Sequence, residues 1–170
     1  MGGAPADGGA QSGGSGASGQ SPRGASAVSP ADSRCGIGPY TIPVGGTLTS
    51  ELAPGDRIAD GDDGEVDCSV TADSDGYRIT VSLAQGSSAF SLMATIAPEG
   101  DGYVGTGAVE FYHPNSGKIT SQTCTVEVLP TQQVGPGKVW GNFDCTDSLQ
   151  EGSPGASCDF RGSFLADNCG

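Results

Sequence analysis

The chain is poor in the residue types on which most catalytic and nucleic-acid-binding sites depend. Its 170 residues include one histidine, one tryptophan and only seven Lys or Arg against 20 Asp or Glu, which gives a net charge of −13. A chain this acidic repels phosphate backbones and anionic membranes, so we expect no nucleic acid partner. It also lacks an apolar stretch long enough to span a bilayer and a charged-then-apolar signal sequence at its start.

Recognised catalytic motifs are missing as well. A Ser-His-Asp triad would have to use His113, which precedes Pro114 in a predicted hairpin loop, and no Gly-x-Ser-x-Gly motif is present. One histidine with scattered carboxylates makes no recognised zinc site. We therefore expect no enzymatic activity and no cofactor, with a small secreted hydrolase as the weaker alternative.

Apolar and polar residues alternate through most of residues 64–164, and no helical period longer than about two turns stands out. The Asp75-Gly76 pair predicts a hairpin between residues 64–72 and 77–84, with Val66, Cys68 and Val70 on its inner face. Further strands are predicted at residues 90–96, 103–111, 118–129, 139–145 and 158–164, and one more at 37–42 or 47–52. This count predicts an all-β fold of about eight strands, either an antiparallel β-sandwich or a partly closed barrel.

Six cysteines stand at residues 35, 68, 124, 145, 158 and 169 without a C-x-x-C pair, which favours disulfides over metal ligands. Two of them end a mirrored pattern of alternation. Opposed residues in an antiparallel pair keep a constant index sum, so the pattern predicts a hairpin with four pairs on one face. In it Val139, Gly141, Phe143 and Cys145 face Phe164, Gly162, Phe160 and Cys158, and a Cys145–Cys158 disulfide follows.

The other cysteines allow three connectivities. Cys68 and Cys124 both fall on inner faces of predicted interior strands, so we expect a bond between them. Cys35 and Cys169 would then join the two ends of a disulfide-stapled domain. Such disulfides are typical of an oxidising compartment, so the chain is expected to be extracytoplasmic: periplasmic, outer-membrane-anchored or secreted.

The mirrored hairpin also has an outer face. Asn142 would lie opposite Arg161 and Asp144 opposite Asp159, with Trp140 two residues before Asn142. Arg161, diagonal to Asp144, would neutralise it. A tryptophan flanked by polar groups is a common binding anchor, so Trp140, Asn142 and Arg161 are the predicted recognition surface. Burial of Trp140 in the core is the alternative.

An acidic loop is the candidate metal site. Residues 60–67 hold five carboxylates with glycines between them, and the predicted ligands are Asp60, Asp62, Asp63 and Glu65. Calcium takes six to eight oxygen ligands from loops of this kind. The spacing departs from an EF-hand, because Gly64 falls at the fifth position of a loop that starts at Asp60. Calcium binding is therefore an alternative to solvated acidic turns.

Residues 1–33 differ from the rest in composition, because 26 of them are Gly, Ser, Ala or Pro. Such a stretch buries too little apolar surface to offset its ordering entropy. It is predicted to be a flexible linker in front of a disulfide-bonded all-β domain at residues 34–170.

A Gly/Ser/Ala/Pro-rich tether that leads into a small disulfide-bearing β domain resembles mature bacterial lipoproteins, whose lipidated first cysteine would stand where Met1 stands. The resemblance covers at most the first third of the chain and includes no lipobox; a secreted protein with a plain linker is the alternative. It implies contact with a membrane only through an N-terminal lipid anchor. The expected function is a non-enzymatic binding or structural module of the cell envelope, with an unknown protein or carbohydrate at the cell surface as partner. A calcium-dependent binding module is the alternative.

Overall fold

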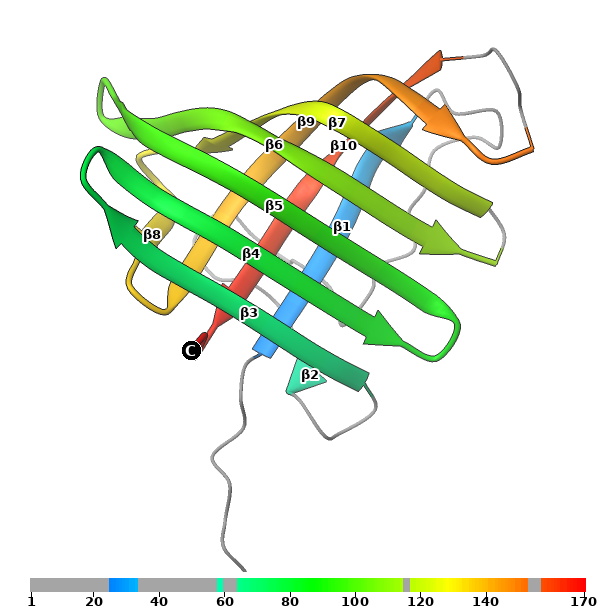
Figure 1. The fold of residues 1–170 in the computed structure, drawn as a ribbon, viewed down its shortest axis with the longest axis horizontal. Helices are drawn as coiled ribbons and strands as arrows, with labels where there is room; N and C mark the ends of the chain where they lie inside the picture. Colours follow the sequence, from blue (N-terminus) through cyan, green and yellow to red (C-terminus); the bar gives the residue numbers. More distant parts are fainter. Residues whose placement is uncertain (1–24, 34–57, 60–63, 115–116, 153–156) are drawn as a thin grey trace, which may run out of the picture.

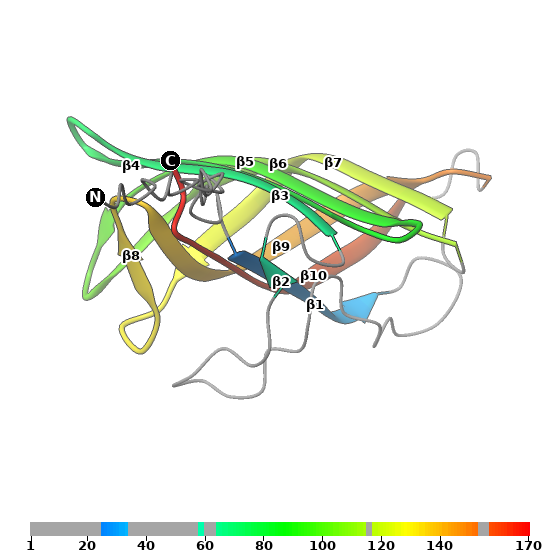
Figure 2. The ribbon, with the colours of Figure 1, turned by 90° about the horizontal axis from the view of Figure 1, so that it is seen from below.

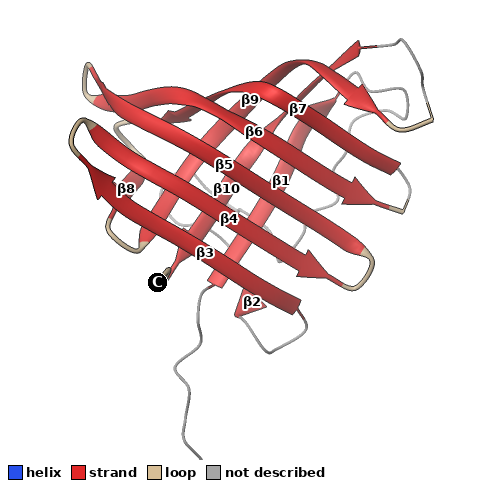
Figure 3. Ribbon diagram, viewed as in Figure 1, coloured by secondary structure: helices blue, strands red, loops and turns tan. Residues whose placement is uncertain are grey.

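The structure, a computed structural model, describes residues 25–33, 58–59, 64–114, 117–152 and 157–170. These residues form strands and no helix, which confirms the all-β prediction (Figure 3). The strands are β1 (Ala25–Ser33), β2 (Ile58–Ala59), β3 (Gly64–Asp73), β4 (Gly76–Gln85), β5 (Ser88–Glu99), β6 (Gly102–His113), β7 (Gly117–Val128), β8 (Gln133–Gly135), β9 (Lys138–Gln150) and β10 (Ser157–Asp167).

Strands β3 to β7 form a meander in which each strand pairs with the next one along the chain (Figure 1). The predicted β3–β4 hairpin is present and keeps one register over all ten residues of β3, with Ser74 and Asp75 as its turn residues. The predicted inner residues Val66, Cys68 and Val70 are buried. Alternation of apolar and polar residues therefore predicts correctly which side chains of this hairpin face the core.

The sheet continues from β7 to β9, β10, β1 and β2, so that one antiparallel sheet folds into two layers, with β8 attached to β9. Figure 2 shows β3 to β7 along one side and β1, β2, β9 and β10 along the other. The two edge strands of the sheet, β2 and β3, contact each other. The turn between β8 and β9 also contacts β3, because the Gly137 N–H donates a 2.9 Å hydrogen bond to the Val70 carbonyl. The result is a flattened, nearly closed barrel.

Aromatic rings from both layers fill the interior of the barrel. The ring centroid of Phe143 on β9 lies 5.6 Å from that of Phe90 on β5 and 5.2 Å from that of Phe160 on β10. Phe111 on β6 lies 5.3 Å from Phe160. Full burial of each ring contributes about 1.5–3 kcal/mol, so this cluster fastens one layer to the other.

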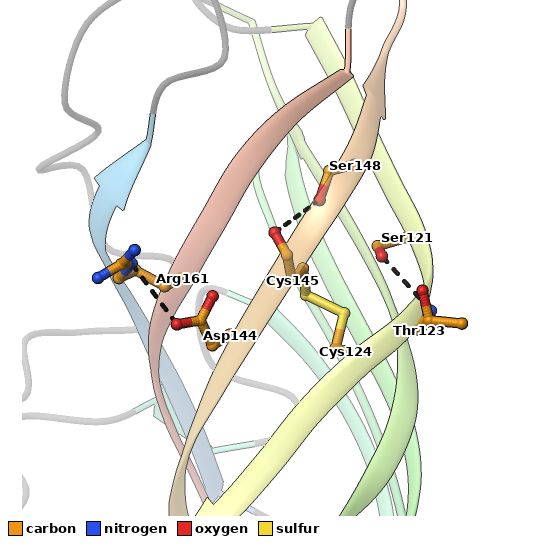
Figure 4. The surroundings of a disulfide bond; sticks show 7 residues. All are labelled: Ser121, Thr123, Cys124, Asp144, Cys145, Ser148 and Arg161. Atoms are coloured by element: carbon orange, nitrogen blue, oxygen red, sulfur yellow. Dashed lines mark hydrogen bonds and ion pairs between the residues drawn. A yellow bond between two sulfur atoms is a disulfide. The ribbon is translucent and has the colours of Figure 1, made fainter.

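The disulfides differ from the predicted ones. Cys124 on β7 bonds Cys145 on β9 (Figure 4), Cys68 on β3 bonds Cys169 beyond the end of β10, and Cys158 is disulfide-bonded as well. The pairings Cys145–Cys158, Cys68–Cys124 and Cys35–Cys169 are therefore wrong. The reason is that β9 has a neighbour on each side. Cys145 lies directly opposite Cys124 on β7, and the mirrored pattern carries no information about that side.

The predicted β9–β10 hairpin is present, but its register is displaced by two residues. Cys145 lies opposite Phe160 and Phe143 lies opposite Gly162. The ladder shifts between Cys158 and Phe160, close to Asp147 of β9, whose φ is +56°. A bulge of this kind resets the pairing, and a displacement of two residues leaves every side chain on its predicted face.

The strand β1 lies inside the predicted linker. Ala25–Ser33 pair antiparallel with β10, so the prediction of a linker over residues 1–33 is wrong for these nine residues. Strand pairing uses backbone groups, which small residues supply as well as large ones. Residues 1–24, and the strand predicted at 37–42 or 47–52, lie outside the described residues.

Candidate functional site

An open groove, lined by both polar and apolar surface, lies on the outer face of β7, β9 and β10. It has a volume of about 230 Å³ and is called the outer groove below. Six of its lining residues carry hydroxyl, amide, carboxylate or guanidinium groups, namely Thr125, Glu127, Asn142, Asp144, Arg161 and Ser163. The inward-facing Phe143 and Gly162 complete the lining.

Strand register brings these polar side chains together. Glu127 on β7 lies opposite Asn142 on β9, which lies opposite Ser163 on β10. In the next row along the strands, Thr125 lies opposite Asp144 and Asp144 opposite Arg161. Successive side chains of a strand point to opposite faces, so the same strands that send Phe143 and Val126 inward send these polar groups outward.

Asn142 is held in one orientation at the centre of the outer groove. Its Oδ1 accepts a 2.8 Å hydrogen bond from Ser163 Oγ and a 3.1 Å bond from Gln132 Nε2, and its Nδ2 donates a longer, 3.5 Å bond to Gln132 Oε1. Gln132 is fixed in turn, because its Oε1 accepts a 2.9 Å bond from the Leu129 N–H. A polar group that is positioned before a ligand arrives loses less entropy on binding.

Arg161 and Asp144 form a loose ion pair beside this amide (Figure 4). Arg161 Nε lies 3.8 Å from Asp144 Oδ2, and the two side chains are 44% and 49% exposed. At this distance the contact is longer than a hydrogen bond. Because a half-exposed pair contributes little to stability, both groups can exchange this contact for a ligand at small cost.

The predicted recognition residues divide between the outer groove and its surroundings. Asn142 and Arg161 line the outer groove, although Arg161 lies opposite Asp144 and not opposite Asn142 as predicted. Trp140 lies opposite Leu165 and is only 6% exposed. It is therefore buried, which was the alternative interpretation, and it does not line the outer groove.

Other groove residues were not singled out from the sequence. Thr125 and Glu127 alternate with the buried Cys124 and Val126, so the polar side of β7 was readable. Alternation alone did not predict that β7 pairs with β9, because β8 and its turns separate these two strands in the sequence. Gln132 gave no signal, because its role depends on the turn between β7 and β8.

The acidic loop is only partly described. Asp60, Asp62 and Asp63 lie outside the described residues, and Glu65 is an exposed residue of β3 opposite Ala84. Within the described ranges, no group of three or more His, Cys, Asp or Glu side chains is arranged to hold a metal ion. Calcium binding by this loop stays a prediction.

His113 ends β6, opposite Gly117, and is partly buried. It lines neither the outer groove nor the hollows near Asp73–Gly76 and near Leu129–Pro130.

No protein-family model, curated protein or solved structure matches this chain. In the part of the chain that the structure describes, no helix is long and apolar enough to cross a membrane. Because no known protein matches, the function is inferred from the residues of the outer groove.

Proposed function

We propose that this protein is an exported, non-enzymatic binding module of the cell envelope, whose outer groove holds a neutral, hydroxyl-rich ligand of the carbohydrate class. The observation that carries the proposal is the fixed amide of Asn142, flanked by Ser163, Glu127 and the Arg161–Asp144 pair. Adjacent donors and acceptors of this kind suit the neighbouring hydroxyls of a sugar ring.

The charge of the chain supports a neutral ligand. A net charge of −13 opposes polyanions such as nucleic acids and acidic polysaccharides. Inside the outer groove two carboxylates, Glu127 and Asp144, accompany one guanidinium, Arg161, and each of these groups can form hydrogen bonds to hydroxyls.

The disulfides support export. Cys68–Cys169 and Cys124–Cys145 are intramolecular bonds, and such bonds persist in oxidising compartments. These disulfides fit a periplasmic, outer-membrane-anchored or secreted location. The Gly-, Ser- and Ala-rich composition of residues 1–24 suits a tether between a lipid anchor and the barrel, as in bacterial lipoproteins.

Isothermal titration of the full chain with soluble chitin and cellulose oligosaccharides tests the proposal. The unchanged protein is expected to bind at least one of them. Asn142→Ala removes the amide and should weaken binding about fivefold, because Oδ1 already accepts two hydrogen bonds and about one bond from Nδ2 to the ligand is lost. The matched control is Leu149→Ala, an outward residue of β9 that is 61% exposed and lies outside the outer groove.

Two results would count against the proposed function. One is the absence of binding to any of these oligosaccharides. The other is equal weakening by Asn142→Ala and Leu149→Ala, which would place the binding surface elsewhere. Thermal unfolding of both variants shows whether each is still folded.

A further inference from the structure

A row of exposed polar side chains crosses the barrel at right angles to its strands. Each member lies directly opposite the next one on the neighbouring strand. From β3 to β10 the row consists of Thr71, Arg78, Thr95, Thr106, Thr125, Asp144 and Arg161. Its last three members line the outer groove.

The row also enters a second hollow on the outer face. This hollow encloses about 340 Å³ and lies between the β3–β4 turn and strands β5 and β6. Thr95 and Thr106 line it together with Ala97 and Val104. Its far side is the turn at Asp73–Gly76, where Arg78 Nη2 lies 3.0 Å from Asp73 Oδ2.

The second hollow and the outer groove adjoin each other. Thr106, in the second hollow, lies opposite Thr125 in the outer groove, and Val104 lies opposite Glu127 in the same way. Neighbouring strands are about 4.8 Å apart, so the path from Thr95 on β5 to Arg161 on β10 crosses four spacings and measures roughly 19 Å. That length is several times the width of one sugar ring.

The lining of this path fits a glycan better than a peptide. The path runs over a sheet face, where strand backbones are already paired, so it offers no edge for an added peptide strand. Its apolar groups are small, such as Ala97 and Val104, and give a peptide side chain no deep pocket. The threonines instead present hydroxyl and methyl groups at strand spacing, which match the alternating hydroxyl and C–H surface of a neutral glycan.

We propose that the ligand is a linear neutral glycan that lies across the strands, with one segment in the outer groove and the next over Thr125, Thr106 and Thr95 in the second hollow. The inference rests on the proposed function and adds the extent and direction of the ligand. Each additional sugar that reaches the second hollow adds contacts to a chain that is already bound, so affinity should rise with glycan length.

The test compares a disaccharide with longer oligomers of the same sugar, by isothermal titration of the full chain. The double variant Thr95→Ala/Thr106→Ala should weaken binding of the longer oligomers about fivefold, the loss expected for about one hydrogen bond, and leave the disaccharide unaffected. Thr80→Ala is the matched control, because Thr80 is an exposed threonine of β4 outside the row.

Equal affinity for short and long oligomers, or long-oligomer binding that the double variant leaves unchanged, would overturn this inference while Asn142→Ala still weakens binding and the proposed function stands. Failure of every oligomer to bind would overturn both. A larger effect of Thr80→Ala than of the double variant would move the extended site away from the row.

Discussion

The two halves of the barrel are built differently. From β3 to β6 each hairpin keeps a constant register over its full length, and no described disulfide joins two of these strands to each other. Beyond them the β6–β7 and β9–β10 ladders each contain a register shift, and a disulfide links β7 to β9. The outer groove lies wholly in this second half.

The difference shows where regular alternation is enough and where it is not. In strands β3 to β6, packing of inward Val, Ile, Leu and Phe side chains sets the structure, and local turns set the register. In strands β7 to β10, β7 pairs with β9 and the chain after β10 lies beside β3, although these segments are not consecutive in the sequence. Disulfides and bulges help to hold these pairings. Bulges often lie next to functional sites because they redirect side chains.

Opening the barrel should have the largest effect. Replacing Cys68 and Cys169 by Ala removes a link across 101 residues, which is expected to lower the free energy of unfolding by about 4.7 kcal/mol in a chain-entropy treatment. Replacing Cys124 and Cys145, 21 residues apart, should lower it by about 3.3 kcal/mol. Guanidinium unfolding measures both, and a larger loss for the second pair would contradict the view that the first one closes the barrel.

Removing the ring that joins the layers should have a similar or slightly smaller effect. Phe143→Ala is expected to lower the free energy of unfolding by about 3–5 kcal/mol, because Phe143 is 2% exposed and contacts Phe90 and Phe160. The control is Met93→Ala on the outer face of β5, where the side chain is 62% exposed and the change should stay within about 0.5 kcal/mol. Urea unfolding of both variants makes the comparison, and a small loss for Phe143→Ala would mean that the layers are not joined through this ring.

The meander should be sensitive to added bulk in its backbone contacts. A Cβ on Gly105 would overlap the Thr95 carbonyl oxygen and lie 2.7 Å from Ile96 Cα, so Gly105→Ala is expected to lower the free energy of unfolding by about 3 kcal/mol. Gly86→Ala is the control, because φ there is +57° but nothing lies within 4 Å, and it should lower stability by about 1 kcal/mol. Thermal unfolding ranks the pair, and equal losses would show that β5 and β6 can separate to admit the methyl group.

Groove residues should matter least for stability. Arg161→Ala removes a half-exposed ion pair, so the free energy of unfolding should fall by less than about 1 kcal/mol. The same variant should weaken oligosaccharide binding about tenfold, because a charged donor is lost. Unfolding and titration of one sample separate the two effects. A large loss of stability without a change in binding would assign Arg161 a structural role.

The meander could be predicted from the sequence because its signals are local. Alternation placed Val66, Cys68 and Val70 inward, and the Asp75-Gly76 pair correctly predicted the β3–β4 hairpin, although its turn residues are Ser74 and Asp75. The mirrored cysteines correctly indicated the β9–β10 hairpin and its faces, which placed Asn142 and Arg161 outward.

The rest depends on contacts between distant segments. The neighbour of β9 on its other side decides that Cys145 bonds Cys124, and no pattern within β9 or β10 contains that information. The bulge near Asp147 decides the register, and the pairing of β1 with β10 involves small residues whose composition indicated a linker. The threonine row likewise becomes visible only when the register of every strand pair is known.

Chemical-shift mapping of the full chain by NMR, during titration with a chitin oligosaccharide, tests the central claim most directly, namely that the outer face of the irregular half binds a neutral glycan. The largest shifts are expected at Asn142, Arg161 and Ser163, with Thr106 and Thr95 joining them when the oligomer is longer. Shifts centred outside the outer groove and the second hollow, for example around Leu149, or no shifts at any concentration, would contradict it.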